Sequence, residues 1–364
     1  MTSTSTTRTT GPARPVERER PADPAAVGPV LVSRRRTWWP LAIALGAVLL
    51  AAAISVAVGS RTLGPAELID GVRGALAGVT TDPAAAVVAA RVDRTLIGAV
   101  VGLAVGLSGA AMQGLTRNPL ADPGILGVNA GAALVVVLGI TWLGITGPGV
   151  YVWLALLGGV LAAALVYAVS AAAPGGPAPL TMALAGAALS AGAISVVAGV
   201  LVSDRGALDT FRFWQVGSVA GRPAGVVLDV LPLLVISVLI VAFAGPVLNA
   251  TALGDDLERA LGQRVHLARG VVAVGAVGLA ASAVALAGPV GFVGLVVPHL
   301  VRLVTGPDYR RILLGSALLG PVLVLLTDTL GRVVMPPSEI QVGIMTAVLG
   351  APALIWLVRR VAVR

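Results

Sequence analysis

The chain alternates between long apolar runs and short polar breaks. From Trp38 onward, runs of Ala, Val, Leu and Gly are interrupted by segments that carry Arg, Asp, Asn and Pro. A helix needs about 20 apolar residues to span a bilayer. The pattern predicts an all-α, polytopic membrane protein of about ten transmembrane helices. The predicted spans lie near residues 38–59, 95–115, 125–144, 149–172, 180–203, 224–248, 271–290, 291–306, 312–334 and 342–358.

The first 36 residues differ from the rest of the chain. They are rich in Thr, Pro and Arg and show no apolar periodicity, which favours a disordered tail. The apolar run from Trp38 to Gly59 exceeds the h-region of a signal peptide, which is about 7–15 residues long. We therefore expect a disordered cytoplasmic tail at 1–36 and one membrane domain at 37–364.

The even number of spans places both termini on one side of the membrane. Arginines flank the first and last spans, at 34–36 and 359–364, and cytoplasmic segments carry an excess of basic residues. Both termini are therefore predicted to be cytoplasmic, and the protein to be a multi-pass component of the cell membrane.

Composition supports this class and excludes several others. The chain has 57% hydrophobic and 12% charged residues, whereas soluble domains carry about 25% charged residues. It has no cysteine, so disulfides, thiolate metal sites and cysteine nucleophiles are excluded. The net charge is +8, and every Lys or Arg position is Arg. We interpret these arginines as markers of cytoplasmic segments in a membrane protein rather than as a nucleic-acid-binding surface. Without Lys there is no Walker-type phosphate loop, and no catalytic, cofactor or metal motif is found.

One polar break, QGLTRNPLADPGILG at 113–127, contains two turn-forming dipeptides, Asn118-Pro119 and Asp122-Pro123. We interpret it as a cytoplasmic connection whose polar residues fix the fold. The segments LSGAAMQGL (107–115) and LAGPVGFVGL (286–295) resemble each other. Because five spans per half would make such repeats run in opposite directions, they suggest an inverted internal repeat.

Asp328, in LLTDTLGR, is the clearest charge within a span. An intramembrane acid is a candidate proton relay, which would suit a proton- or sodium-coupled secondary transporter. The competing interpretation, which we weigh more heavily, is an i,i+4 pair with Arg332 near the outer end of the helix.

Three further segments are candidates for function. Arg91 and Arg94, in R-V-D-R, could pair with an acidic partner or anchor to lipid phosphate. The longest inside loop, 249–270, could form a short helix that docks on a cytoplasmic partner, or an ordinary solvated loop. In the fifth span, Gly186, Ser190 and Ser195 could line a translocation path, although close helix packing is the commoner use of small residues.

Three segments resemble a known family. RVDRTLIGAVVGLAVGLSGAAMQGLTRNPLADPGILGVNAGAAL, AVALAGPVGFVGLVVPHLVRLVTGPDYRR and PSEIQVGIMTAVLGAPALIWLVRR resemble, in that order, the permeases of iron-siderophore, haem and vitamin B12 ABC importers. The resemblance covers about Arg91 to the C-terminus and implies a dimeric, ten-span permease. Its expected partners are two cytoplasmic ATP-binding subunits, one extracytoplasmic solute-binding protein and a second permease, identical or closely related.

The resemblance also implies roles for particular residues. Arg91, Arg94 and Arg332 match the outside arginines that receive acids of the binding protein, although Val92-Asp93 replaces the usual Leu-Pro inside R-x-x-R. The translocation path is expected between the fifth and tenth spans. The 249–270 loop matches the ATPase-docking loop, and its expected coupling residues are Asp255, Asp256, Leu257, Glu258, Arg259, Gly262 and Arg264. The implied function is import of a ferric siderophore, with haem or cobalamin as alternatives.

Overall fold

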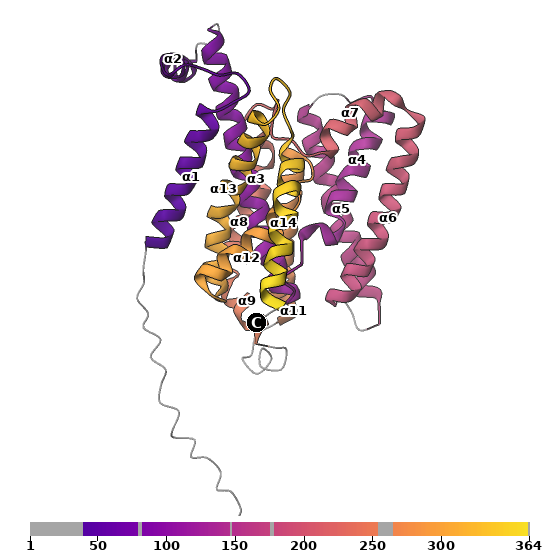
Figure 1. Ribbon diagram of the computed structural model, residues 1–364. Helices are drawn as coiled ribbons and strands as arrows, with labels where there is room; N and C mark the ends of the chain where they lie inside the picture. Colours follow the sequence, from indigo (N-terminus) through magenta and orange to yellow (C-terminus); the bar gives the residue numbers. More distant parts are fainter. Residues whose placement is uncertain (1–38, 79–81, 146–147, 175–177, 254–264, 363–364) are drawn as a thin grey trace, which may run out of the picture. The chain divides into compact units, whose positions relative to one another are not determined.

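The computed structural model describes residues 39–78, 82–145, 148–174, 178–253 and 265–362. These residues form helices and connecting segments and contain no β-strand (Figure 1). The helices are α1 (Trp39–Ala57), α2 (Pro65–Leu76), α3 (Pro83–Thr116), η2 (Pro123–Leu126), α4 (Val128–Leu143), α5 (Pro148–Ala172), α6 (Pro179–Ser203), α7 (Arg205–Gln215), α8 (Val226–Ala242), α9 (Gly245–Ala252), α11 (Val265–Ala287), α12 (Val293–Thr305), α13 (Tyr309–Val333) and α14 (Val342–Ala362). The predicted tail, 1–36, lies outside the described residues.

The predicted spans correspond to helical segments of the described chain. Among the described residues, five helices are long and apolar enough to cross a membrane, and the pair α8–α9, bent by 49°, adds a sixth when the pair is counted as one span. Four shorter apolar helices, within α1, α4, α12 and α14, complete the set. The predicted division between the seventh and eighth spans is confirmed, because α11 ends at Ala287 and α12 begins at Val293.

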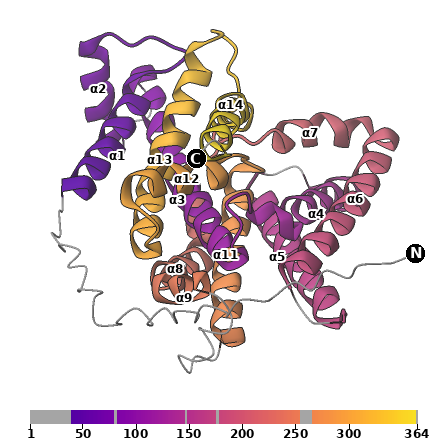
Figure 2. The ribbon, with the colours of Figure 1, turned by 60° about the horizontal axis from the view of Figure 1, so that its bottom comes forward.

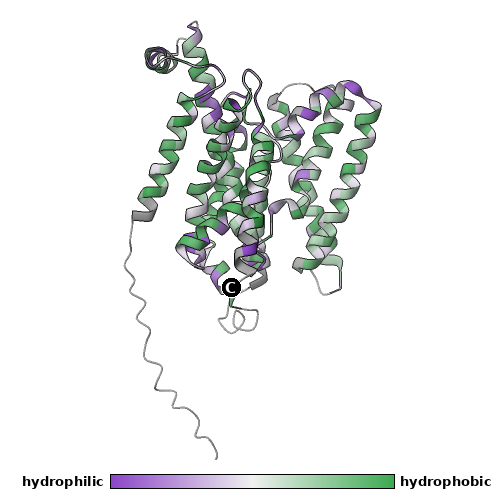
Figure 3. Ribbon diagram, viewed as in Figure 1, coloured by the Kyte–Doolittle hydropathy of each residue, from purple (hydrophilic) through white to green (hydrophobic). Residues whose placement is uncertain are grey.

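Two short helices, α2 and α7, were not predicted. Their sequences, PAELIDGVRGAL and RGALDTFRFWQ, mix charged and apolar residues, so neither stands out in a search for continuous apolar runs. α7 buries Ala207, Phe211 and Trp214 and leaves Asp209 and Arg212 exposed. Both helices lie at the end of the bundle that is uppermost in Figure 1, and Figure 3 shows hydrophilic residues concentrated at the two ends of the bundle.

The 34-residue helix α3 lies at the centre of the bundle and contacts α13 more extensively than any other helix. In Figures 1 and 2, α1 and α2 lie on one side of this centre and α4 to α7 on the other. The two helices α3 and α13 approach closely because glycines at spacing four line one face of α3. A Cβ at Gly102 would stand 2.5 Å from the carbonyl oxygen of Gly320, and one at Gly106 would stand 2.6 Å from that of Ser316.

The polar break at 113–127 fixes the turn from α3 to α4, as predicted. Asp122 Oδ1 accepts from the backbone N–H of Gly124 at 2.8 Å and so caps η2. Asn118 Oδ1 accepts from the N–H of Leu120 at 2.9 Å. Arg117, in the left-handed conformation at the end of α3, donates from Nε to the carbonyl of Thr251 at 2.6 Å. These side chains are engaged with backbone atoms.

The two similar segments pack against each other. Gly109, in 107–115, lies so close to Gly294, in 286–295, that a Cβ on either would crowd the backbone of the other. Gln113 Nε2 donates to the carbonyl of Gly294 at 3.1 Å. This contact accounts for the glycines at 109 and 294, and the inverted repeat itself stays a prediction.

The glycine contact between α3 and α13 generates a test. We expect Gly102→Ala to lower the free energy of unfolding by about 1–3 kcal/mol, because the added methyl meets the Gly320 backbone. The matched control is Gly46→Ala in α1, where the added methyl would have no neighbouring atom within 4 Å. Thermal unfolding of both variants in detergent micelles measures the difference. Equal melting temperatures for the two variants would contradict the close contact.

Candidate functional site: a buried arginine–carboxylate cluster

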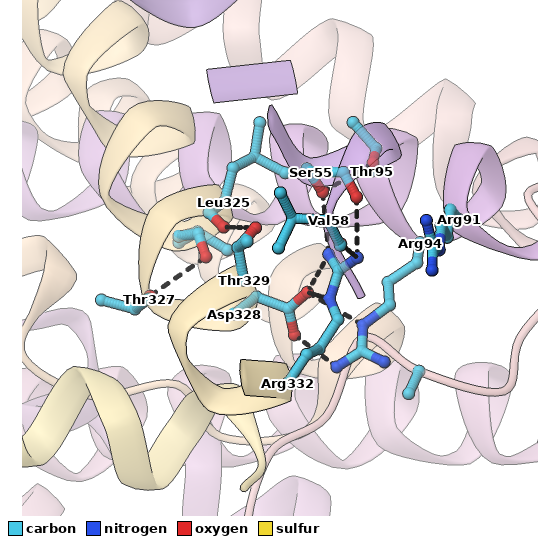
Figure 4. A network of polar contacts seen from close by, with 12 residues as sticks. Ser55, Val58, Arg91, Arg94, Thr95, Leu325, Thr327, Asp328, Thr329 and Arg332 are labelled. Atoms are coloured by element: carbon cyan, nitrogen blue, oxygen red, sulfur yellow. Dashed lines mark hydrogen bonds and ion pairs between the residues drawn. The ribbon is translucent and has the colours of Figure 1, made fainter. Parts of the chain in front are cut away.

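The three arginines singled out in the sequence meet at one end of the bundle. Arg91 and Arg94 lie in the first half of α3, and Arg332 lies in the last turn of α13. Because the two helices run antiparallel, the start of α3 meets the end of α13. Figure 4 shows Arg94 and Arg332 directed toward Asp328, with Arg91 nearby on α3. We call Arg91, Arg94, Arg332, Asp328 and Glu339 the arginine–carboxylate cluster.

Asp328 is held between two guanidinium groups. Arg94 donates from Nε to Oδ2 and from Nη2 to Oδ1, both at 2.8 Å. Arg332 donates to Oδ2 from Nε at 3.0 Å and from Nη2 at 2.6 Å. The Asp328 side chain is 1% exposed. The predicted i,i+4 pair with Arg332 is therefore confirmed, and Arg94 forms a second, bidentate pair from 234 residues away in the sequence.

Arg91 and Arg332 also close the C-terminal end of α1. The last carbonyls of a helix have no partner within it and carry partial negative charge, which suits a cation. Nη1 of Arg332 donates to the carbonyls of Ser55 and Val58, and Nη1 of Arg91 donates to those of Val56 and Ala57. Arg91 Nη2 also donates to the carbonyl of Arg61. Two buried arginines thus bind α1 to α3 and α13.

A serine and a threonine complete the inner part of this arrangement. Ser55 Oγ accepts from Arg332 Nη2 at 2.8 Å and shares a hydrogen bond of 2.7 Å with Thr95 Oγ1. Both residues are buried. Sequence analysis missed them, because a single Ser or Thr in an apolar helix gives no signal without knowledge of its neighbours.

Glu339 is the outermost member of the cluster. It lies in the connection between α13 and α14, where its Oε2 accepts from Arg94 Nη1 at 2.5 Å and its Oε1 accepts from Ser60 Oγ at 2.8 Å. Burial by itself raises the pKa of the Glu339 carboxyl, but the hydrogen bonds from Arg94 and Ser60 outweigh this and hold the pKa below its usual value. Glu339 is therefore ionised at neutral pH. Its side chain is 30% exposed, against 11% for Arg94.

A cavity of about 220 Å³ opens beside the cluster. Its lining is strongly basic, with four arginines and one carboxylate; the lining residues are Gly59, Ser60, Arg61, Val87, Ala90, Arg91, Arg94, Gly221, Arg332 and Glu339. A basic cavity of this size suits an anionic group such as a carboxylate.

The structure divides the three arginines by accessibility. Arg332 is 1% exposed and Arg91 is 6% exposed, and both are engaged with the end of α1. Arg94 contacts Glu339, whose side chain is more exposed than those of the three arginines. Binding of a partner's acids by these three residues stays a prediction, and their burial shows that at least two of them also have a structural role.

Another arginine, Arg222, which follows the cavity-lining Gly221, also has a structural role. Its Nη1 donates to the carbonyls of Ala285 at 3.0 Å and of Leu286 at 2.6 Å, at the C-terminal end of α11. Arginines on this side of the protein therefore serve as helix caps at two separate helices.

The residues expected to line a path in α6 have different environments. Gly186 is buried and packs against the backbone of Ile125 in η2. Ser190 is half-buried, near Gly127, and Ser195 is exposed, donating from Oγ to the carbonyl of Ala191 at 2.8 Å. Gly186 therefore has the packing role that we considered the commoner one. A translocation role for these residues stays a prediction.

The expected ATPase-coupling residues lie outside the described residues. They are Asp255, Asp256, Leu257, Glu258, Arg259, Gly262 and Arg264. The helices that flank them, α9 and α11, place both ends of this loop at the end of the bundle opposite the arginine–carboxylate cluster.

The geometry of Asp328 generates a test of the cluster. We expect Asp328→Asn to lower the free energy of unfolding by about 3 kcal/mol or more, because it leaves two buried guanidinium groups without their counter-charge. Asp70→Asn on α2 is the matched control, since Asp70 is 71% exposed and pairs with the exposed Arg73. Thermal unfolding in detergent micelles compares the two. A loss at Asp328 no larger than that at Asp70 would be incompatible with a buried ion-pair network.

Comparisons with known proteins agree with this architecture. The model of the FecCD transport family matches residues 46–360. The chain is 40% identical over 270 residues to a probable siderophore transport system permease of Bacillus subtilis, covering 74% of this chain and 81% of the relative. It is 37% identical over 317 residues to the ferric enterobactin transport system permease of Escherichia coli, covering 86% and 92%. It is also 37% identical over 276 residues to a hemin transport system permease of Yersinia pestis, covering 74% and 82%.

A solved structure shares the fold. It is described as an inward-facing conformation of a metal-chelate type ABC transporter, and it superposes with a TM-score of 0.78 at 27% identity over 89% of this chain and 100% of that one. The family match extends over nearly the whole membrane domain and includes every helix that carries the arginine–carboxylate cluster. The chain therefore belongs to the FecCD transport family, the transmembrane permease subunits of ABC import systems.

Proposed function

We propose that this chain is the permease subunit of an ATP-driven importer of ferric siderophores. The observation that carries the proposal is its identity, over most of its length, with permeases named for siderophore and ferric enterobactin transport. The hemin permease supports haem as a second candidate substrate. Cobalamin remains the third substrate that the family resemblance allows.

The proposed assembly is a permease pair with two cytoplasmic ATP-binding subunits and one extracytoplasmic solute-binding protein. Several large apolar side chains of α5 and α6 are exposed in the single chain; they include Leu157, Leu161, Leu165, Leu180, Leu184 and Ile194. Surfaces of this kind suit lipid or a second permease. The second permease is either an identical chain or a close relative.

The proposed location is the cell membrane, with both termini in the cytoplasm. The first residues of α1 and the last residues of α14 lie at the same end of the bundle, opposite the arginine–carboxylate cluster. In this orientation the cluster, α2 and α7 face outward, and the loop 249–270 faces the ATP-binding subunits. Movement of that loop during ATP hydrolysis would tilt the spans and open the path alternately to the two sides.

The energy source separates this proposal from a secondary transporter. In proteoliposomes that contain the complete importer, we expect uptake of a radiolabelled ferric siderophore to stop when orthovanadate blocks the ATPase. The same uptake should continue when ionophores abolish the proton and sodium gradients. Uptake that survives vanadate and stops with ionophores would instead support ion coupling. The geometry gives Asp328 little capacity for such a role, because both of its oxygens are bonded to arginines.

Arg94 is the arginine that we propose contacts the solute-binding protein. We expect Arg94→Gln to weaken binding of the importer's purified solute-binding protein about tenfold, since one charged contact is lost. Biolayer interferometry on permease in nanodiscs measures this. Arg73→Gln on α2 is the control, because Arg73 is an exposed arginine at the same end of the bundle but outside the cluster.

The variant must be shown to fold before the binding result is interpreted. Arg332 remains bonded to Asp328 in Arg94→Gln, so we expect the helix bundle to form. An unchanged dissociation constant for a folded Arg94→Gln would remove the docking assignment and leave the transport proposal intact.

A further inference from the structure

Glu339 occupies the position at which an acidic partner would meet Arg94. A guanidinium carries five N–H donors. Arg94 uses Nε and Nη2 on Asp328 and Nη1 on Glu339. The Asp328 contacts are buried, whereas the Glu339 contact is the outward one. An incoming carboxylate that approaches along this outward side of Arg94 would therefore meet Glu339.

The charges of the cluster indicate what Glu339 does there. Arg94, Arg332, Asp328 and Glu339 carry two positive and two negative charges, and so sum to zero. Without Glu339 the remaining three groups sum to +1, beside the guanidinium groups of Arg61 and Arg91 that also line the cavity. A carboxylate supplied by a partner would restore the balance that Glu339 provides within the chain.

Glu339 is also held in a way that permits exchange. It lies in the connection that follows α13, and its carboxylate is fixed by two side chains, Arg94 and Ser60. The other carboxylate of the cluster, Asp328, accepts four hydrogen bonds from arginines in α3 and α13. Glu339 can therefore separate from Arg94 while Arg94 stays paired with the buried Asp328.

We propose that Glu339 is an internal competitor, which occupies Arg94 in the resting permease and is displaced by a carboxylate of the solute-binding protein. The proposal rests on the proposed docking role of Arg94. Docking then exchanges one ion pair of Arg94 for another, so Arg94 keeps a carboxylate partner on its outward side until the solute-binding protein arrives. Displacement also frees the connection between α13 and α14 from Arg94 and Ser60, which links binding on the outside to the start of α14.

The test compares variants of the full-length permease in nanodiscs, with the importer's purified solute-binding protein as the probe. Removing the competitor by Glu339→Gln should tighten binding about threefold to tenfold. Ser60→Ala, which removes one of the two groups that hold Glu339, should tighten it by a smaller factor. In the double variant Glu339→Gln/Arg94→Gln the gain should disappear, because there is no arginine to release.

The matched controls are Asp70→Asn and Asp209→Asn. Each removes one exposed acid from the same end of the bundle, on α2 and α7, without touching the cluster. If these variants tightened binding as much as Glu339→Gln, the effect would be general charge attraction and the proposal would be overturned. Thermal unfolding of Glu339→Gln checks that the cluster has kept its fold.

Two further outcomes separate the proposals. If Arg94→Gln weakens binding but Glu339→Gln leaves it unchanged or weaker, the internal competitor is overturned and the docking role stands. If Arg94→Gln has no effect, both are overturned. Tightening must also occur in nanodiscs of phosphatidylcholine alone; a gain confined to nanodiscs with phosphatidylglycerol would assign the released arginine to lipid phosphate and overturn the proposal.

Discussion

The close approach of α3 and α13 is the constraint on which the rest of the site depends. Gly102 and Gly320 allow the two backbones to touch, and this contact fixes the antiparallel register of the helices. The register in turn brings Arg94, near the start of α3, to Asp328, near the end of α13. In a membrane there is no hydrophobic effect between helices, so van der Waals contact and buried polar pairs must supply the association. The glycines and the ion pairs therefore act together on one helix pair.

The arginine–carboxylate cluster shows how one residue type can serve two purposes at one location. Arg91 and Arg332 satisfy the carbonyls at the end of α1 and attach that helix to the bundle. Arg94 uses one edge of its guanidinium on the buried Asp328 and another on Glu339. The planar group, with donors in several directions, suits this arrangement in a way that an ammonium group does not. Arg332, which caps α1, and Arg94, which we propose for docking, are joined through the carboxylate of Asp328.

Much of the fold could be predicted from the sequence, because long apolar runs are a strong signal. The positions of the apolar helices, the division between α11 and α12 and the structural role of the 113–127 connection were correct. Two spans differ from the prediction: α3 begins at Pro83 rather than near residue 95, and the predicted span 224–248 is broken into α8 and α9. The amphipathic helices α2 and α7 were missed, since their charged residues interrupt the apolar pattern. The sequence shows the glycines of α3 at regular spacing. It does not show that they face α13, because small residues occur throughout this chain.

The site was only partly predictable. The sequence places Asp328 and Arg332 one helical turn apart, and their pair followed from that spacing. Arg94 and Asp328 are 234 residues apart, and only tertiary packing brings them together. Neither the burial of Arg91 and Arg332 nor the contact between Glu339 and Arg94 has a sequence signature. A family resemblance identifies arginines as important without telling which of them support the fold.

Arg94 and Asp328 interact directly and strongly across the α3–α13 contact. A double-mutant cycle tests this most directly, with the free energy of unfolding measured in mixed micelles for Arg94→Gln, Asp328→Asn and the double variant. The structure predicts a coupling energy of about 1.5 kcal/mol or more, since the pair is bidentate and buried. Strictly additive effects of the two substitutions would contradict the account.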